Sequence, residues 1–125
     1  MKSIKLKPEL PELQHLNEFI STMLKKENLQ VNLIVEEIFV NIIDYSKTEF
    51  VQVNVEYDNQ ILTMEFIDNG IEFNPLIKKD PEKPQNIDEA EIGGLGIFLA
   101  KKMSDEQDYQ YINNENHLKI IKKVE

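Results

Sequence analysis

The stretch Phe66-Ile67-Asp68-Asn69-Gly70 ends an apolar strand in an acid and turns through a glycine. Apolar and polar residues alternate before it, so the period-two geometry of a strand places the Asp68 side chain on the apolar face. Taken alone, Asp-Asn-Gly is more often a plain turn than a binding site. The rest of the chain therefore decides whether this acid has a function.

All four glycines of the chain fall in two places, Gly70 and the cluster Gly93, Gly94 and Gly96. Glycine is needed where the backbone takes a positive φ or lies against another group, so this confinement predicts two backbone segments close to one bound molecule. The second cluster opens a predicted helix. Free N-H groups and the helix dipole favour a phosphate at such an amino end.

The length, residue content and net charge of the chain limit the classes of function that it can have. The length of 125 residues predicts a single domain, residues 1–125, and no apolar run approaches the ~20 residues of a membrane helix. The absence of cysteine excludes disulfides and thiol chemistry and agrees with a cytoplasmic location. A net charge of -9 argues against nucleic-acid or anionic-membrane partners and leaves proteins and small molecules. Because there is no arginine, a bound phosphate would need lysine, metal or backbone N-H groups, which favours a metal-nucleotide.

Hydrophobic periodicity predicts an α+β domain. Strands are expected near residues 4–6, 51–57, 61–67, 107–112 and 117–124, with Asn113 to Asn116 joining the last two, and helices after Pro11, over 30–45 and over 93–103.

Glu37 and Asn41 interrupt the apolar side of the second helix. Four residues apart, they lie one above the other, whereas Glu36 diverges from Asn41 by roughly 140°. Only Glu37 can therefore act together with Asn41. Such a pair considered alone is more often a partly exposed polar pair than a functional one.

A charged segment with several prolines, about residues 74–92, separates Gly70 from the second glycine cluster. Loops this long inside a compact domain tend to be active-site lids or disordered segments. We predict a lid, with a merely mobile loop as the alternative.

Two common nucleotide motifs do not fit the second glycine cluster. A P-loop requires lysine and a hydroxyl residue after the last glycine, whereas Ile97 and Phe98 follow Gly96. A Rossmann fingerprint requires a third glycine where Leu99 stands, near the start of the first βαβ unit.

Three boxes remain, in this order: Glu37-x-x-x-Asn41 on a helix, Asp68-x-Gly70 at a strand end, and Gly94-x-Gly96 before another helix. Together with the lid they resemble the Bergerat-fold (GHKL) ATPases, which include histidine kinases, gyrase-type topoisomerases and bacterial anti-sigma serine kinases. The runs 68–75 and 92–99 look most like the anti-sigma regulatory group. The resemblance implies a two-layer α/β sandwich with three helices on one face of a mixed, mostly antiparallel sheet, binding ATP and Mg²⁺.

The resemblance also implies residue roles. Asp68 would accept a hydrogen bond from the adenine amino group, and Gly70 would let the backbone pass close to the base. Asn41 would be a Mg²⁺ ligand, and Glu37 would be the general base on an attacking serine. Backbone N-H groups of Gly94-Leu95-Gly96 would bind the phosphates.

Two hypotheses about function follow. One is an ATP-binding, anti-sigma-type serine-protein kinase that phosphorylates an anti-sigma-factor antagonist and regulates a sigma factor. The other is a non-catalytic module whose protein binding is gated by ATP or ADP. It is motivated by the missing arginine and by Glu72, which stands where much of the superfamily has glycine. The last strand also lacks threonine in residues 118–121, so a hydroxyl contact near adenine is not expected. A homodimer is expected from the resemblance alone.

Overall fold

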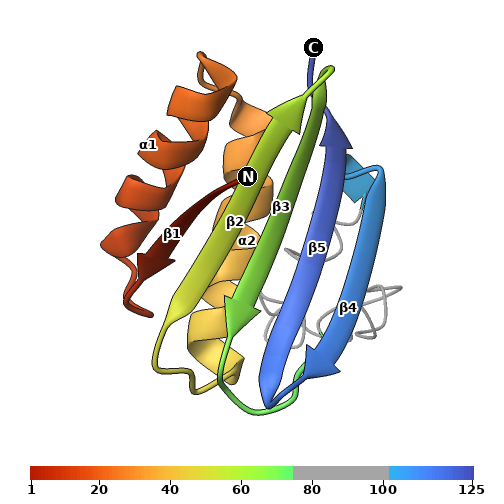
Figure 1. The fold of residues 1–125 in the computed structure, drawn as a ribbon. Coiled ribbons are helices and arrows are strands. Elements are labelled where there is room, and N and C mark those ends of the chain that lie inside the picture. Colours follow the sequence, from red (N-terminus) through yellow and green to blue (C-terminus); the bar gives the residue numbers. More distant parts are fainter. Residues whose placement is uncertain (75–101) are drawn as a thin grey trace, which may run out of the picture.

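A computed structural model of the chain describes residues 1–74 and 102–125. In Figure 1 they form two layers, with α1 (Glu12–Leu24) and α2 (Leu29–Tyr45) on one face of a five-stranded sheet. The strands are β1 (Lys2–Leu6), β2 (Val51–Asp58), β3 (Ile61–Asp68), β4 (Glu106–Ile112) and β5 (Glu115–Lys123). The predicted two-layer α+β sandwich is confirmed.

The sheet has the order β1-β2-β3-β5-β4, and all four pairings between the described strands are antiparallel. The sheet was predicted to be mixed and mostly antiparallel, and no parallel pair occurs among the described strands. The reason is that the β4–β5 hairpin places β5 beside β3 in the opposite direction, whereas a parallel pair would require a crossover between the two. The predicted lid after Asn74 and the predicted third helix, except its last two residues, Lys102 and Met103, lie outside the described residues.

The core lies between the sheet and the two helices. Alternate residues of the central strands point inward and are buried, as period-two geometry predicts, and they pack on one apolar stripe of each helix. Burying each of these large side chains stabilises the fold by roughly 1.5–3 kcal/mol. Four of the core residues, Ile38, Ile42, Phe66 and Leu118, also line a small cavity beside Asp68 at the end of β3.

Two hairpin turns set the register of the sheet. Asn59 and Gln60 have φ of 52° and 66°, and Asn113 and Asn114 have φ of 54° and 62°. Paired positive φ values match the right-handed twist of the flanking strands, so each turn needs only two residues. The second turn is shorter than predicted, and Asn116 therefore belongs to β5. It pairs directly with Asp68 of β3.

The second helix is held at both ends. The Asn28 side chain caps its start by accepting a hydrogen bond from the Val31 N-H at 3.0 Å, and the Ser46 N-H donates to the Ile42 carbonyl at its end.

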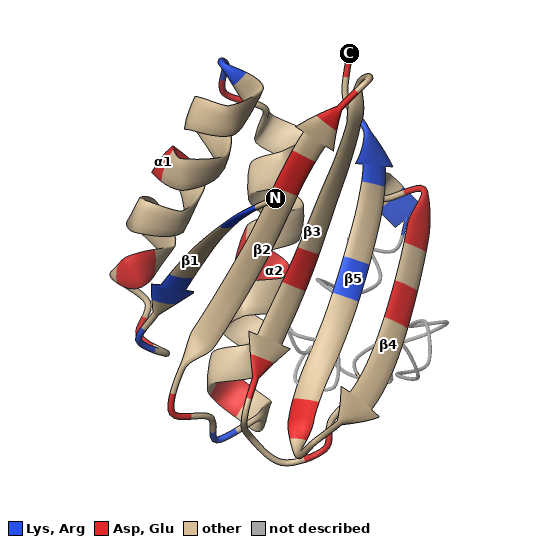
Figure 2. Cartoon of the chain, viewed as in Figure 1, with Lys and Arg blue, Asp and Glu red and all other residues tan. Residues whose placement is uncertain are grey.

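Neither described helix is both long and apolar enough to cross a membrane. Figure 2 shows acidic residues spread over helices and strands alike, which accords with the net charge of -9.

Candidate functional site

Asp68 is the last residue of β3 and is only 3% exposed. Its Oδ1 accepts three hydrogen bonds: from the Ser46 hydroxyl, from the Gly70 N-H at 2.9 Å and from the Asn116 amide at 2.9 Å. No residue within 1–74 or 102–125 donates to its Oδ2. The carboxylate is thus held firmly by one oxygen, and the other oxygen remains available as an acceptor.

Gly70 is required by the close approach of Ser46. A Cβ at Gly70 would lie 2.6 Å from the Ser46 carbonyl carbon and closer still to the Ser46 hydroxyl and carbonyl oxygens. The Ile71 N-H donates to that same carbonyl at 2.8 Å, so the turn after β3 is fastened to the end of α2. From the sequence, the backbone at Gly70 was predicted to lie close to a ligand. In the structure, the close approach of Ser46 already requires a glycine at this position.

Gly70→Ala is therefore expected to destabilise the protein by about 3 kcal/mol, because the backbone of the turn must move away from Ser46. Thermal or urea unfolding of the variant measures this loss. Glu72→Ala is the matched control, since Glu72 is an exposed residue of the same turn segment and should change stability by less than about 0.5 kcal/mol. Equal stability of the two variants would contradict the steric overlap expected between a Cβ at position 70 and Ser46.

Asn41 lies on the inner side of α2 and is 1% exposed. Its amide nitrogen donates to the Glu37 carbonyl one turn earlier, at 2.8 Å, which fixes the orientation of the amide. Its Oδ1 is buried and has no hydrogen-bond partner among the described residues. A buried acceptor without a donor is costly, and such groups often mark a site for a ligand or ion.

Glu37 is half-buried on α2, whereas Glu36 is exposed. Partial burial raises the pKa of Glu37, and the nearby Glu36 carboxylate raises it further. A carboxylate with a raised pKa is a stronger base, a property that suits proton abstraction.

A small cavity brings Asn41 and Asp68 together. It measures about 10 Å³, roughly the room for one water molecule. Its walls come from α2, β3, β4, β5 and the segment after β3; they comprise Ile38, Asn41, Ile42, Phe66, Asp68, Phe73, Tyr109, Asn116 and Leu118. Glu37 and Gly70 do not line it, although each contacts or neighbours a residue that does.

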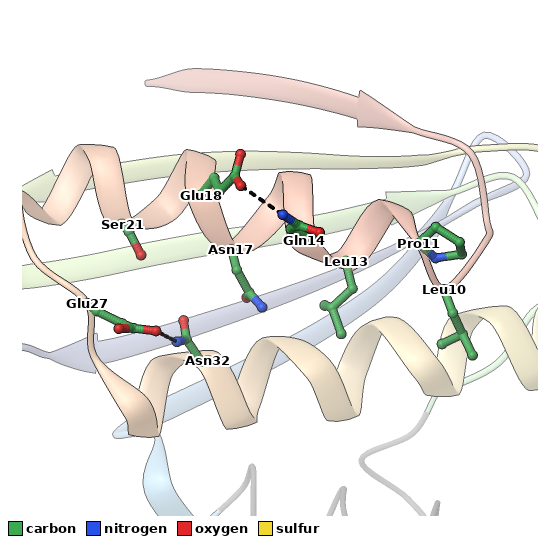
Figure 3. Close-up of a pocket in the computed structure, with 9 residues that line it drawn as sticks. All are labelled: Leu10, Pro11, Leu13, Gln14, Asn17, Glu18, Ser21, Glu27 and Asn32. Atoms are coloured by element: carbon green, nitrogen blue, oxygen red, sulfur yellow. Dashed lines mark hydrogen bonds between the residues drawn. The ribbon is translucent and has the colours of Figure 1, made fainter.

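A larger hollow of about 640 Å³ lies between α1 and the start of α2 (Figure 3). Its polar groups are satisfied in part by the pairs Gln14–Glu18 at 3.2 Å and Asn32–Glu27 at 3.4 Å. Of the predicted site residues that the structure describes, none lines it. The buried Asn17 Oδ1, on the wall of this hollow, also has no hydrogen-bond partner among the described residues, so neither size nor one such acceptor identifies the site. We assign function to the smaller cavity because it brings the Asn41 amide oxygen together with the Asp68 carboxylate.

Gly94, Leu95 and Gly96, the predicted phosphate-binding residues, lie outside the described residues. In the described part of the chain, no group of three or more His, Cys, Asp or Glu side chains is arranged to hold a metal ion.

Sequence reasoning missed three polar residues at this site: Ser46, Tyr109 and Asn116. Tyr109 donates its hydroxyl hydrogen to Asn116 Oδ1, and burial raises the pKa of Tyr109, which keeps the phenol protonated. Asn116 was predicted to lie in a connection because it follows three other polar residues in a row. Because asparagine tolerates a positive φ, the Asn113-Asn114 pair could have indicated a two-residue turn and so placed Asn116 in the strand.

Comparison with known proteins agrees with this architecture. The sequence profile of the histidine kinase-like ATPase domain matches residues 12–122. Among solved structures, the histidine kinase AdeS of Acinetobacter baumannii is similar, with a TM-score of 0.55 and 11% identity over 99% of this chain and 68% of that chain. At this identity the likeness concerns the fold alone. Comparison with curated proteins gave no match.

The family match covers nearly the whole chain and includes both helices and four of the strands described above. By sequence and by fold, this chain belongs to the family of histidine kinase-like ATPase domains.

Proposed function

We propose that this protein binds ATP with Mg²⁺ and is an anti-sigma-type serine-protein kinase that phosphorylates an anti-sigma-factor antagonist and thereby regulates a sigma factor. Membership in a family of ATPase domains supports ATP as the ligand. The assignment of the protein substrate rests on the resemblance of the motif runs 68–75 and 92–99 to that group.

One observation carries the nucleotide part of the proposal. Asp68 Oδ2 and Asn41 Oδ1, two acceptors on the walls of one cavity, receive no hydrogen bond from the described residues. The adenine amino group is a donor that suits Asp68. A cation suits the carbonyl oxygen of Asn41, because Mg²⁺ prefers hard oxygen ligands.

The charge of the protein favours Mg²⁺ as a partner of the nucleotide. Among the described residues no lysine lines the cavity, the chain contains no arginine, and Figure 2 shows acidic residues on both helices and on every described strand except β1. The triphosphate therefore needs a counter-charge that the cavity walls do not supply. Asn41 would hold the ion together with the phosphates, and the ion would neutralise charge during transfer.

Transfer itself would use Glu37. The serine hydroxyl of the protein substrate would give its proton to the Glu37 carboxylate, its oxygen would bond to the γ-phosphorus, and ADP would leave. The raised pKa of Glu37 favours this role.

Adenine is far larger than a cavity of about 10 Å³, so a wall must move when the base enters. Among the described lining residues, Phe73 is the one outside the helices and strands, and its ring stacks on Tyr45 with centroids 5.4 Å apart. We assign the Phe73 ring as the wall that moves, because a side chain on a turn segment can rotate at lower cost than a paired strand can shift, and its rotation keeps the hydrogen bond from the Phe73 N-H to Asn116.

ATP or ADP with Mg²⁺ is expected to stabilise the wild-type fold by ~2.7 kcal/mol at a hundredfold excess over Kd, a shift of several degrees in Tm. Asp68→Asn should lose most of this shift. Three donors keep an oxygen at the Oδ1 place, so the new amide nitrogen must occupy the Oδ2 place and oppose the adenine amino group. The variant should instead gain affinity for inosine nucleotides relative to adenine nucleotides, because inosine carries an oxygen at that position.

Asp44→Asn is the matched control, since Asp44 is an exposed acid on α2. Its replacement should leave the Tm shifts caused by ATP and by ADP unchanged. No stabilisation of folded wild-type protein by either nucleotide would remove the nucleotide proposal altogether.

The non-catalytic module remains the second candidate function. The observation that favours it is the absence of arginine, because phosphoryl transfer often uses a guanidinium to stabilise the transition state. Incubation with labelled ATP, Mg²⁺ and a candidate antagonist, followed by detection of phosphoserine, separates the two candidates. Nucleotide binding without phosphoserine on any antagonist would favour the module.

A further inference from the structure

Asn116 uses all four of its hydrogen-bonding positions within the protein. Its amide nitrogen donates to Asp68 Oδ1 at 2.9 Å and to the Ile71 carbonyl at 2.7 Å. Its Oδ1 accepts from the Phe73 N-H at 2.9 Å and from the Tyr109 hydroxyl. The side chain is 4% exposed, so it has no free group to offer to a ligand.

These four partners also fix which way the amide faces. Rotation of the amide by half a turn would place its oxygen against the Asp68 carboxylate and the Ile71 carbonyl, and its nitrogen against two donors. Each unsatisfied buried group would cost stability. Asn116 therefore presents a donor, and only a donor, to Asp68.

The register of the sheet makes this contact direct. Asp68 and Asn116 are paired across β3 and β5, on the inner face of the sheet. Together with Ser46 and Gly70, Asn116 donates to Oδ1, and no residue in the described part of the chain donates to Oδ2. Removal of the Asn116 amide would free Oδ1 in part and let the carboxylate rotate.

We propose that Asn116 is a positioning residue for base recognition: it does not touch the nucleotide, but holds Asp68 so that Oδ2 selects a base with an exocyclic amino group. This inference rests on the proposed function, in which Asp68 accepts a hydrogen bond from adenine. It identifies Asn116, and not a hydroxyl residue of the last strand, as the partner of Asp68.

The test compares two nucleotides in the full chain, ADP and the diphosphate of purine riboside, which lacks only the amino group. Wild-type protein is expected to bind ADP about 10- to 100-fold more tightly, the usual effect of one hydrogen bond to a charged acceptor. In Asn116→Ala and in the near-isosteric Asn116→Asp, this ratio should fall to within about threefold. Titration calorimetry gives the ratio, and a melting curve identifies which variant is folded. Either folded variant suffices.

Asn54→Ala is the control. Asn54 bonds three side chains, Ser3, Gln52 and Glu65, but lies on the outer face of the sheet, so the affinity ratio of the Asn54→Ala variant should equal that of wild type. If an Asn116 variant loses affinity for both nucleotides by the same factor, Asn116 merely supports the fold and the inference is wrong. Wild-type protein that binds both nucleotides equally would overturn this inference but not nucleotide binding. Wild-type protein that binds neither would overturn the proposed function as well.

Discussion

Glu37→Gln is expected to lower the rate of phosphoryl transfer by about 10²- to 10⁴-fold and to leave nucleotide affinity nearly unchanged. A general base contributes in the transition state, whereas binding of the nucleotide precedes that contribution. Glu37 lies outside the cavity lined by Asp68 and Asn41, so the change should not disturb the base or the ion. Phosphoserine formation and nucleotide Kd, measured on the same preparation, test both parts.

Glu36→Gln is the matched control for this variant. Glu36 is exposed and neighbours Glu37 in sequence, but it points away from Asn41. Its neutralisation removes one cause of the raised pKa of Glu37, so the acidic limb of the pH–rate profile should move slightly to lower pH while the rate on the plateau stays. A wild-type rate for Glu37→Gln would show that Glu37 is not the base.

Asn41→Ala is expected to remove the dependence of ATP affinity on Mg²⁺ and to weaken binding of the Mg²⁺ complex about 100-fold. The side chain offers a single unfilled oxygen, and loss of that oxygen removes a metal ligand already used in the bound ground state. Stability should fall only modestly, because the side chain makes one hydrogen bond, to the Glu37 carbonyl. ATP titrations with Mg²⁺ and with EDTA give the difference directly.

Asn41→Asp is the informative partner of that variant. It keeps an oxygen at the same place while the amide hydrogen bond to Glu37 is lost, so Mg²⁺ dependence should persist. If Asn41→Ala retains the full effect of Mg²⁺, the ion is held elsewhere and the assignment to Asn41 is wrong.

The arrangement of helices and strands was predictable because it depends on local periodicity. Alternation before Asp68 placed that side chain on the inner face, and the structure confirms its burial at 3%. The spacing of Glu37 and Asn41 likewise predicted which of two adjacent glutamates shares a face with the asparagine. In each case the residues compared lie within a few positions of one another in a single helix or strand.

The partners of Asp68 were not predictable in this way. Ser46 is 22 residues away in sequence and Asn116 is 48 residues away. Their contacts depend on how α2 ends and on the register of β5 against β3, which no local pattern in either segment encodes. For the same reason the sequence linked Gly70 to a ligand, whereas the atoms nearest to a Cβ at this position belong to Ser46, its hydroxyl oxygen and its backbone carbonyl.

These sequence separations have a consequence for folding kinetics. The hydrogen bonds from Ser46 and Asn116 to Asp68 form only after the β2–β3 hairpin has docked on the end of α2 and the β4–β5 hairpin has joined β3. Contacts that close long loops carry a large entropic cost and tend to form late, after the folding nucleus. A ligand held by Asp68 would then bind only the finished fold. The bound ligand would lower the unfolding rate and leave the folding rate nearly unchanged. The concentration of nucleotide in the cell would then determine the lifetime of the native state.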